Sequence, residues 1–175
     1  MCYSKRETQD FLVKRKSNLV IRVYFEMEKH KLFMKKALMQ AEKAASVGEI
    51  PVGAVLVKND EIILEAHNLT EQTNNVTSHA EILLLNHYAE LFNEKYLSDC
   101  TLYVTLEPCI MCTGALLWAK LPHLVFGSMD KKGGACGTIL QLAQREQTNH
   151  SINVIQGILE KECEKILSDF FKGLR

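Results

Sequence analysis

Two short segments of the chain carry residue types that can bind a metal ion and move protons. One is His79-Ala80-Glu81, and the other holds two cysteines three positions apart, Cys109 and Cys112, within TLEPCIMCTGAL. Taken alone, the cysteines could be a chance pair, a redox pair, half of a disulfide framework or half of a zinc site. A histidine at a helix start is more often a cap or a satisfied core residue than a ligand. The two segments become informative only when they are considered together.

Cysteine usage and the lack of an export signal remove one of these alternatives. Six cysteines are spread over 175 residues, which is too few and too scattered for a disulfide scaffold. The N-terminal segment lacks the order of charged, apolar and small residues that marks a secretory signal. No apolar run approaches the roughly 20 residues that span a bilayer. We therefore expect reduced thiols, a cytoplasmic location and no membrane partner.

A zinc site accounts for the spacing of both segments. Pro108 is typical of the first turn of a helix, and at that helix start the side chains of Cys109 and Cys112 would point the same way. Free amide groups and the positive end of the helix dipole favour thiolate there, the form that binds zinc. If His79 begins a second helix at the same end of the sheet, three side chains can surround one ion. Three protein ligands and an open position are typical of catalytic zinc, whereas structural zinc has four.

Glu81 adds a proton carrier to this set. Residues at positions i and i+2 do not share a helix face, so Glu81 can stand beside a zinc ion that His79 binds without ligating it. A carboxylate in that position can take a proton from an activated water and pass it to a substrate. A single acid in a first helical turn can also serve only to stabilise the helix dipole.

Hydrophobic periodicity predicts the elements that must position these residues. We expect a helix over 32–45 that ends near Gly48, strands over 51–58 and 61–67, a polar loop over 68–78, a helix from 80 capped by Thr77 or Ser78, a strand over 101–107, a helix from 108, strands over 124–128 and 153–159, and a last helix over 162–171. Because strands and helices alternate, the pattern predicts an α/β fold with helices on both faces of a sheet. One domain is expected over 27–175, preceded by an N-terminal extension, 1–26, outside the core.

The charge balance leaves a nucleic-acid partner open. Lysines and arginines number 21, and so do aspartates and glutamates, which gives a net charge of zero. A neutral chain can still carry a local basic patch. Four cationic residues near the expected site could form one: Lys131, Lys132, Lys172 and Arg175.

The combination of HAE (79–81) with EPCIMC (107–112) resembles the zinc-dependent nucleoside and nucleobase deaminases. Further segments, GEIPVGAVLV, TLYVTLEPCIMC, LVFGSMD and the terminal SDFF, are similar to the bacterial tRNA adenosine deaminases. The similarity runs from about residue 30 to residue 172. Two positions depart from the family pattern: Leu69-Thr70 stand where relatives commonly have Arg-Pro, and Met129 stands where some have Arg.

The resemblance implies a role for each matching residue. His79, Cys109 and Cys112 correspond to the zinc ligands, and Glu81 corresponds to the proton shuttle. The implied substrate-binding residues are Asn68, which would hydrogen-bond the flipped base, Asp130, which would contact the flipped nucleotide, and Asn149, His150 and Phe171, which would face the anticodon loop.

The resemblance also implies a fold and a reaction. The fold is a three-layer α/β/α sandwich on a mostly five-stranded mixed sheet, assembled as a homodimer with one zinc ion per subunit. The reaction is the hydrolytic deamination of adenosine to inosine at the wobble position of a tRNA anticodon stem-loop. The helix over 108–119 is a candidate for part of the dimer contact, and Trp118 on it could be either an interface residue or a core residue.

Two other functions remain open from the sequence. One is a deaminase of a free base or nucleoside, guanine or cytosine/cytidine, that uses the same zinc site. The other is a non-catalytic, zinc-stabilised RNA-binding module, which predicts four protein ligands and which leaves Glu81 without a role.

Overall fold

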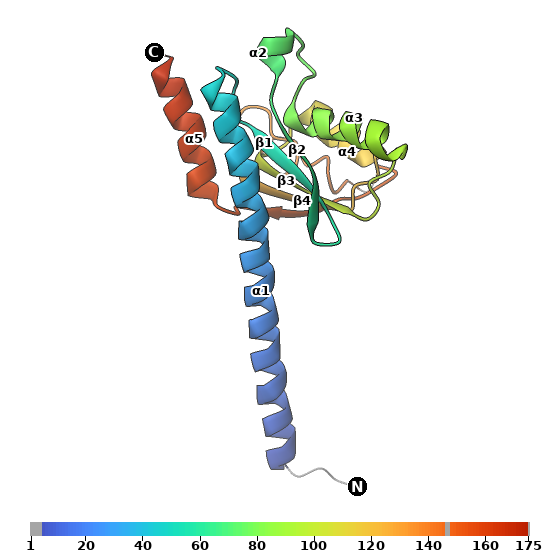
Figure 1. Cartoon of the computed structure of the whole chain (residues 1–175). Coiled ribbons are helices and arrows are strands. Elements are labelled where there is room, and N and C mark those ends of the chain that lie inside the picture. Colours follow the sequence, from blue (N-terminus) through green and yellow to red (C-terminus); the bar gives the residue numbers. More distant parts are fainter. Residues whose placement is uncertain (1–4, 146–147, 175) are drawn as a thin grey trace.

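Five strands form one mixed sheet at the centre of the molecule (Figure 1). The computed structural model describes residues 5–145 and 148–174, with side chains from residue 21 onward. The strands are β1 (Gly53–Lys58), β2 (Glu61–His67), β3 (Cys100–Leu106), β4 (His123–Ser128) and β5 (Asn153–Gln156), in the spatial order β2-β1-β3-β4-β5. β1 runs antiparallel to β2 and to β3, whereas β3, β4 and β5 are parallel.

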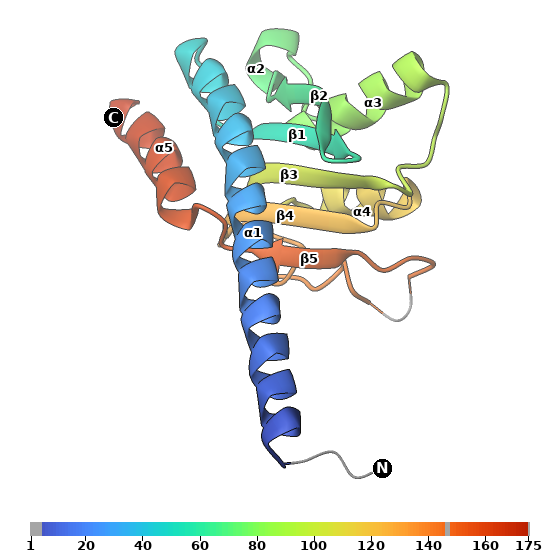
Figure 2. The same cartoon turned by 60° about the horizontal axis from the view of Figure 1, so that its bottom comes forward.

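Helices cover both faces of this sheet, as the sequence predicts (Figure 2). The helices are α1 (Lys5–Ser46), α2 (Thr70–Thr73), α3 (Ala80–Phe92), α4 (Ile110–Trp118) and α5 (Glu160–Gly173). α3 and α4 lie on one face and α1 and α5 on the other, and each face has its own cluster of buried apolar side chains. The expected three-layer α/β/α sandwich with a five-stranded mixed sheet is therefore the observed architecture.

The β1–β2 hairpin shows how closely local sequence sets this architecture. Asn59 and Asp60 connect the two strands with φ angles of 51° and 64°. Two consecutive residues with positive φ form a type I′ turn, whose twist matches that of the paired strands. Asparagine and aspartate tolerate this conformation better than most residues, so the short turn expected from the sequence is confirmed.

α1 differs most from the expected element. Apolar periodicity predicts a helix over 32–45, but α1 begins at Lys5 and continues without interruption to Ser46. The segment contains neither glycine nor proline, so no residue within it breaks a helix once it has formed. The first half of α1 extends away from the sheet in Figures 1 and 2. The expected end is confirmed, since Gly48 follows the helix with a φ of 82°.

α1 approaches the sheet most closely at Gly53. A Cβ atom added to Gly53 would lie 2.1 Å from the carbonyl oxygen of Ala37 and 2.3 Å from the backbone nitrogen of Ala41. The helix backbone therefore rests directly on the first residue of β1, a contact that only glycine permits.

Several expected boundaries were wrong, each for a local reason. α3 is capped by His79 rather than by Thr77 or Ser78, and α4 begins at Ile110 with Cys109 as its N-cap, so Pro108 precedes the helix. β5 ends at Gln156 because Gly157 adopts a φ of 82°, which interrupts extended backbone. The polar loop contains a single helical turn, α2, that composition does not reveal. Within 5–145 and 148–174, no helix has both the length and the apolar character to cross a membrane.

Candidate metal centre and active site

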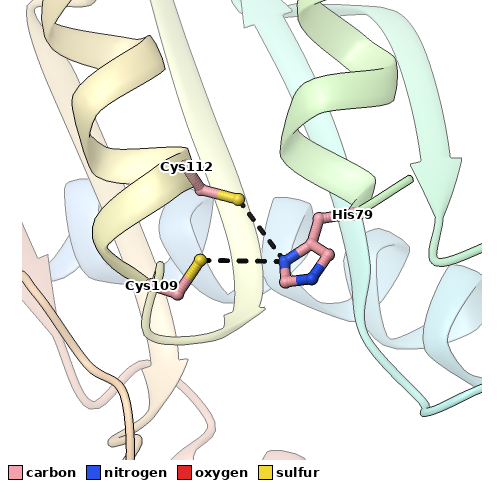
Figure 3. Close-up of side chains that lie close together, drawn as sticks. All are labelled: His79, Cys109 and Cys112. Atoms are coloured by element: carbon pink, nitrogen blue, oxygen red, sulfur yellow. Dashed lines mark hydrogen bonds between the residues drawn. The ribbon is translucent and has the colours of Figure 1, made fainter. Parts of the chain in front are cut away.

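His79, Cys109 and Cys112 converge where α3 and α4 begin (Figure 3). His79 Nδ1 lies 3.8 Å from Cys109 Sγ and 3.5 Å from Cys112 Sγ. The three possible ligand atoms all lie within 4.8 Å of one another. His79 lies 30 and 33 positions before the two cysteines, so the fold and not chain proximity brings it to them.

The backbone of each helix start explains this convergence. His79 and Cys109 are N-cap residues with extended backbone, at φ/ψ of −73°/149° and −71°/175°. N-cap side chains usually accept a hydrogen bond from the first turn of their own helix, but neither residue makes such a bond. Their side chains turn toward each other instead. Cys112, one turn into α4 and fully buried, completes the group.

The two thiols and the imidazole influence one another's protonation. The pKa of Cys109 is lowered because its thiolate accepts a hydrogen bond from Cys112 and a further one from His79. The pKa of Cys112 is raised because its thiol donates to Cys109, and by burial. The pKa of His79 is raised by its contact with the Cys109 sulfur. A thiolate, an imidazole and a second thiol within contact distance form the donor set that zinc prefers.

Glu81 lies against this group but does not belong to it. It is only 3% exposed, and its Oε2 atom is the one buried side-chain N or O atom among the described residues that lacks a hydrogen-bond partner. Burial raises the pKa of its carboxyl group, with His79 acting in the opposite direction. A buried carboxylate without a partner is costly for folding, and such groups are typical of functional sites.

These observations test whether the residues fit a zinc ion. Three N and S donors, within 4.8 Å of one another, can each supply one ligand atom. The unpartnered oxygen of Glu81 beside them can accept a hydrogen bond from a molecule bound in the open position. Three protein ligands match a catalytic zinc site rather than a closed structural one. The site is therefore compatible with zinc.

Asn68 is hydrogen-bonded to the first residue of α3, which follows His79 directly. Its side chain is buried, and its Oδ1 atom accepts a hydrogen bond of 3.0 Å from the backbone N–H of Ala80. Its backbone N–H donates to the carbonyl of Val52. With Oδ1 engaged at the helix start, the Nδ2 group is the donor that Asn68 can offer to a base.

Asp130 opens the loop that follows β4 and lies over the start of α4. Its side chain accepts a hydrogen bond from the backbone N–H of Lys132 at 2.9 Å. The backbone of Cys109 forms an isolated antiparallel β-bridge with that of Gly134, and the N–H of Ala135 donates to the carbonyl of Pro108. The loop that carries Asp130 is thus attached to the segment that carries the two cysteines.

The remaining residues implied by the resemblance lie elsewhere. Asn149 and His150 line a cavity of about 270 Å³ together with Trp118 and Lys120. His150 Nε2 is 2.7 Å from the carbonyl oxygen of Leu121, so its ring is held against the end of α4. Phe171 is exposed on α5, on the other face of the sheet, and packs edge-on against Phe170. Trp118 is 76% exposed, so its interpretation as a core residue was wrong.

Sequence reasoning missed two buried carboxylates that hold the loops around the site. Glu107 accepts hydrogen bonds from the loop of Asp130. Glu49 accepts from the backbone of Glu71 and Gln72 in α2, at 3.2 and 2.8 Å, and so anchors the loop after Asn68. Both are acids flanked by apolar residues, in TLEPC and GEIPV, and that pattern was the available signal.

A comparison with protein families places this chain in a known group. A model of the MafB19-like deaminases matches residues 27–175. The chain belongs to the MafB19-like deaminase family. The resemblance to deaminases inferred from the HAE and EPCIMC segments is thereby confirmed.

Individual deaminases are similar over most of the chain. A tRNA-specific adenosine deaminase of Bacillus subtilis is 46% identical over 149 residues, which are 85% of this chain and 92% of that protein. A solved structure from work on A-to-I editing by tRNA:A34 deaminases at the wobble position superimposes with a TM-score of 0.74 at 38% identity, covering 77% of this chain and 98% of that one. A guanine deaminase of Bacillus subtilis superimposes with a TM-score of 0.54 at 35% identity, over 57% of this chain and 64% of its own.

Proposed function

We propose that this protein is a zinc-dependent deaminase that converts adenosine to inosine at the wobble position of a tRNA anticodon. The observation that carries the chemistry is the group of His79, Cys109 and Cys112 beside a buried Glu81 whose Oε2 atom has no hydrogen-bond partner. The tRNA substrate is supported by the extent and identity of the match to the tRNA-specific adenosine deaminase of Bacillus subtilis.

His79, Cys109 and Cys112 would hold one zinc ion per subunit. When bound, zinc would activate a water molecule at neutral pH by lowering its pKa. The two cysteines hold their sulfur atoms at the start of α4, and they would bind zinc as thiolates. These three residues would leave the fourth coordination position of the zinc ion to solvent and substrate.

Glu81 moves the protons of the reaction. Its carboxylate accepts a proton from the attacking water and donates it to N1 of adenine, which makes C6 more electrophilic. After the C6–O bond forms, Glu81 takes the remaining proton of the water from the new C6 hydroxyl and donates it to the exocyclic amino group. The C6–N bond then breaks to release ammonia and leave the C6 carbonyl of inosine. The balance is one water consumed and one ammonia released per inosine formed. Since Glu81 Oε2 makes no hydrogen bond within the described residues, no such contact has to be broken first.

Asn68 and Asp130 would hold the base outside its stack. A base within a stacked loop cannot reach the buried carboxylate, so it has to be extruded into the site. Asn68 offers its Nδ2 donor beside the start of α3, and Asp130 would contact the nucleotide from the loop after β4. Asn149, His150 and Phe171 would contact the rest of the anticodon loop, with Lys131, Lys132 and Lys172 as nearby cations. Single-stranded loops are recognised mainly by stacking and edge contacts, so a neutral chain is compatible with this partner.

A homodimer is part of the proposal. Its support is a group of large apolar side chains that are exposed on α4 and on the loop beside it: Ile110, Trp118, Ile139 and Leu140. Isolated exposed apolar residues are common, but several together on one helix and its neighbouring loop are typical of an interface. Light scattering at several concentrations measures the subunit count directly.

A tRNA substrate would place the protein in the cytoplasm. We take 27–175 as the deaminase domain, with 1–26 outside its core.

A deaminase of free guanine or cytidine is the second candidate, favoured by the likeness to the guanine deaminase of Bacillus subtilis. One experiment separates the two. The protein is incubated with an anticodon stem-loop that carries adenosine at the wobble position, and in parallel with guanine and cytidine. Inosine in the stem-loop and no ammonia from the small molecules is the expected result. Turnover of a small molecule with an unmodified stem-loop would overturn the tRNA proposal.

A further inference from the structure

Glu107 is a buried carboxylate whose hydrogen bonds all reach into one loop. It follows β3 directly and is 2% exposed. Its Oε1 atom accepts hydrogen bonds from the backbone N–H groups of Cys136 at 2.9 Å and Thr138 at 3.0 Å. Its Oε2 atom accepts from the N–H of Asp130 at 3.1 Å and from the Thr138 hydroxyl. Three amide donors and one hydroxyl therefore converge on a single side chain.

The loop over 130–138 is shaped around this carboxylate. A Cβ atom on Gly134 would lie 2.3 Å from Glu107 Oε2, so the loop backbone can close over the carboxylate only because Gly134 has no side chain. The N–H of Gly134 donates to the carbonyl of Asp130, which curls the loop back on itself. The two ends of the curl, Asp130 and Thr138, are both bound by Glu107.

The position of Glu107 in the chain gives this anchor a functional meaning. Glu107 is separated from Cys109 only by Pro108, so it shares the rigid segment that positions two members of the metal centre. Asp130 is the loop residue whose backbone N–H Glu107 holds. The carboxylate thus fixes where Asp130 stands relative to Cys109.

We propose that Glu107 is a positioning residue for the deamination, which orients Asp130 toward the extruded nucleotide by holding the loop over 130–138. This role rests on the proposed function, because Asp130 is assigned to the substrate there. Glu107 touches neither the substrate nor the reacting atoms. It acts through the loop, so its loss should weaken substrate binding while the metal centre stays intact.

Glu107→Gln is the informative substitution. Glutamine keeps the size of the side chain, but it has only one oxygen acceptor, and its NH₂ group cannot accept from an N–H. At least one of the three loop amides must then lose its partner. An unpaired buried amide is costly, so the loop is expected to rearrange rather than stay in place.

The test is a double-mutant cycle with Asp130→Ala, measured on the zinc-loaded full chain with the wobble-adenosine stem-loop. Glu107→Gln should raise KM about tenfold, with a smaller change in kcat and an unchanged zinc content. In the Asp130→Ala background the same substitution should change KM less than about twofold, because the residue through which Glu107 acts is gone. Tyr103→Phe, a buried change on the opposite face of the sheet, is the control for a general loss of stability.

Amide hydrogen exchange provides a readout that needs no turnover. In the wild type, the amides of Asp130, Cys136 and Thr138 should be protected, and Glu107→Gln should release them while leaving β3 and β4 protected. Equal losses in both backgrounds, a loss of zinc in Glu107→Gln, or loop amides that remain protected would each overturn the role of Glu107. If the wild type deaminates guanine and not the stem-loop, the proposed function fails, and the same cycle measured with guanine still decides whether Glu107 acts through Asp130.

Discussion

The two ends of β3 carry polar clusters that differ in whether their charged groups are paired. At its carboxyl end lie the metal centre and Glu81, a buried carboxylate with one unpartnered oxygen. At its amino end a cavity of about 400 Å³ is lined by polar groups of α1, the β1–β2 turn and the sheet. There Lys29 pairs with Asp60, Lys58 lies 2.9 Å from Asp99, and His30 Nδ1 lies 2.9 Å from the Tyr103 hydroxyl.

The difference separates groups that stabilise the fold from groups that we propose carry out the chemistry. At the amino end, oppositely charged side chains pair at the surface, where each pair contributes little and costs little. At the carboxyl end, a buried carboxylate with one unpartnered oxygen costs stability. A protein can retain such an arrangement when a ligand or a reaction depends on it.

Removing the unpartnered carboxylate should separate activity from stability. Glu81→Ala is expected to lower kcat by roughly 10²–10⁴-fold, because the variant lacks the proposed proton carrier. The zinc content should not change, and the melting temperature should stay the same or rise, since a buried unpaired carboxylate has been removed. Steady-state kinetics, metal analysis and a thermal melt measure the three quantities. Near-normal turnover in this variant would remove Glu81 from the mechanism.

Removing a ligand should affect both metal binding and stability. Cys112→Ala should lose zinc and activity together, and its melting temperature should fall toward that of chelator-treated wild type, because a ligand that binds only the folded state stabilises it. Cys163→Ala, a change at another buried cysteine on the opposite face of the sheet, is the matched control and should retain zinc. Equal zinc content in the two variants would contradict the metal centre.

A substitution in the cluster at the amino end of β3 should change the stability of the protein but not its activity. Tyr103→Phe removes the hydroxyl that contacts His30 and should lower the free energy of unfolding by about 1 kcal/mol. Its kcat and KM for the stem-loop should match the wild type. Denaturant unfolding and the deamination assay test this, and a selective loss of activity would show that the two ends of β3 are coupled.

The smallest expected effect is a pH dependence from His30. Burial lowers the pKa of His30 below its usual value near 6.5, and Glu26 partly opposes that shift. The unfolded chain therefore binds this proton more readily than the folded chain does. The contribution of His30 to the free energy of unfolding is fully present above about pH 6.5 and decreases as the pH falls below that value. His30→Gln should flatten this part of the stability profile, measured by urea unfolding between pH 5 and 7.5. An unchanged slope would assign the pH dependence to other groups.

Local sequence predicted much of this molecule where a short segment determines the outcome. The turn at Asn59-Asp60, the end of α1 near Gly48 and the alternation of strands and helices follow from residue types and spacing alone. The approach of His79 to Cys109 and Cys112 could also be anticipated, because two helix starts at one end of a sheet lie close together. The roles assigned to Glu81, Asn68 and Asp130 remain predictions.

What the sequence did not reveal depends on contacts between distant segments. The apolar neighbours of Glu107 and Glu49 indicate burial, but the backbone amides that they hold come from distant loops that the sequence does not place beside them. The exposure of Trp118 likewise depends on what packs beyond the end of α4. The caps of α3 and α4 were misplaced because the side chains of His79 and Cys109 face each other across two helices, which is a tertiary contact and not a local preference.

The close contact at Gly53 sets a lower limit on the size of an excised catalytic unit. Ala37 and Ala41 cover the backbone of the first residue of β1. A truncation that begins after Ala41 would leave this strand end open to water, next to the residues that lead to Asn68. Shortened versions of the protein, for crystallisation or for fusion to another domain, should therefore keep the second half of α1, which the stretch 27–175 does.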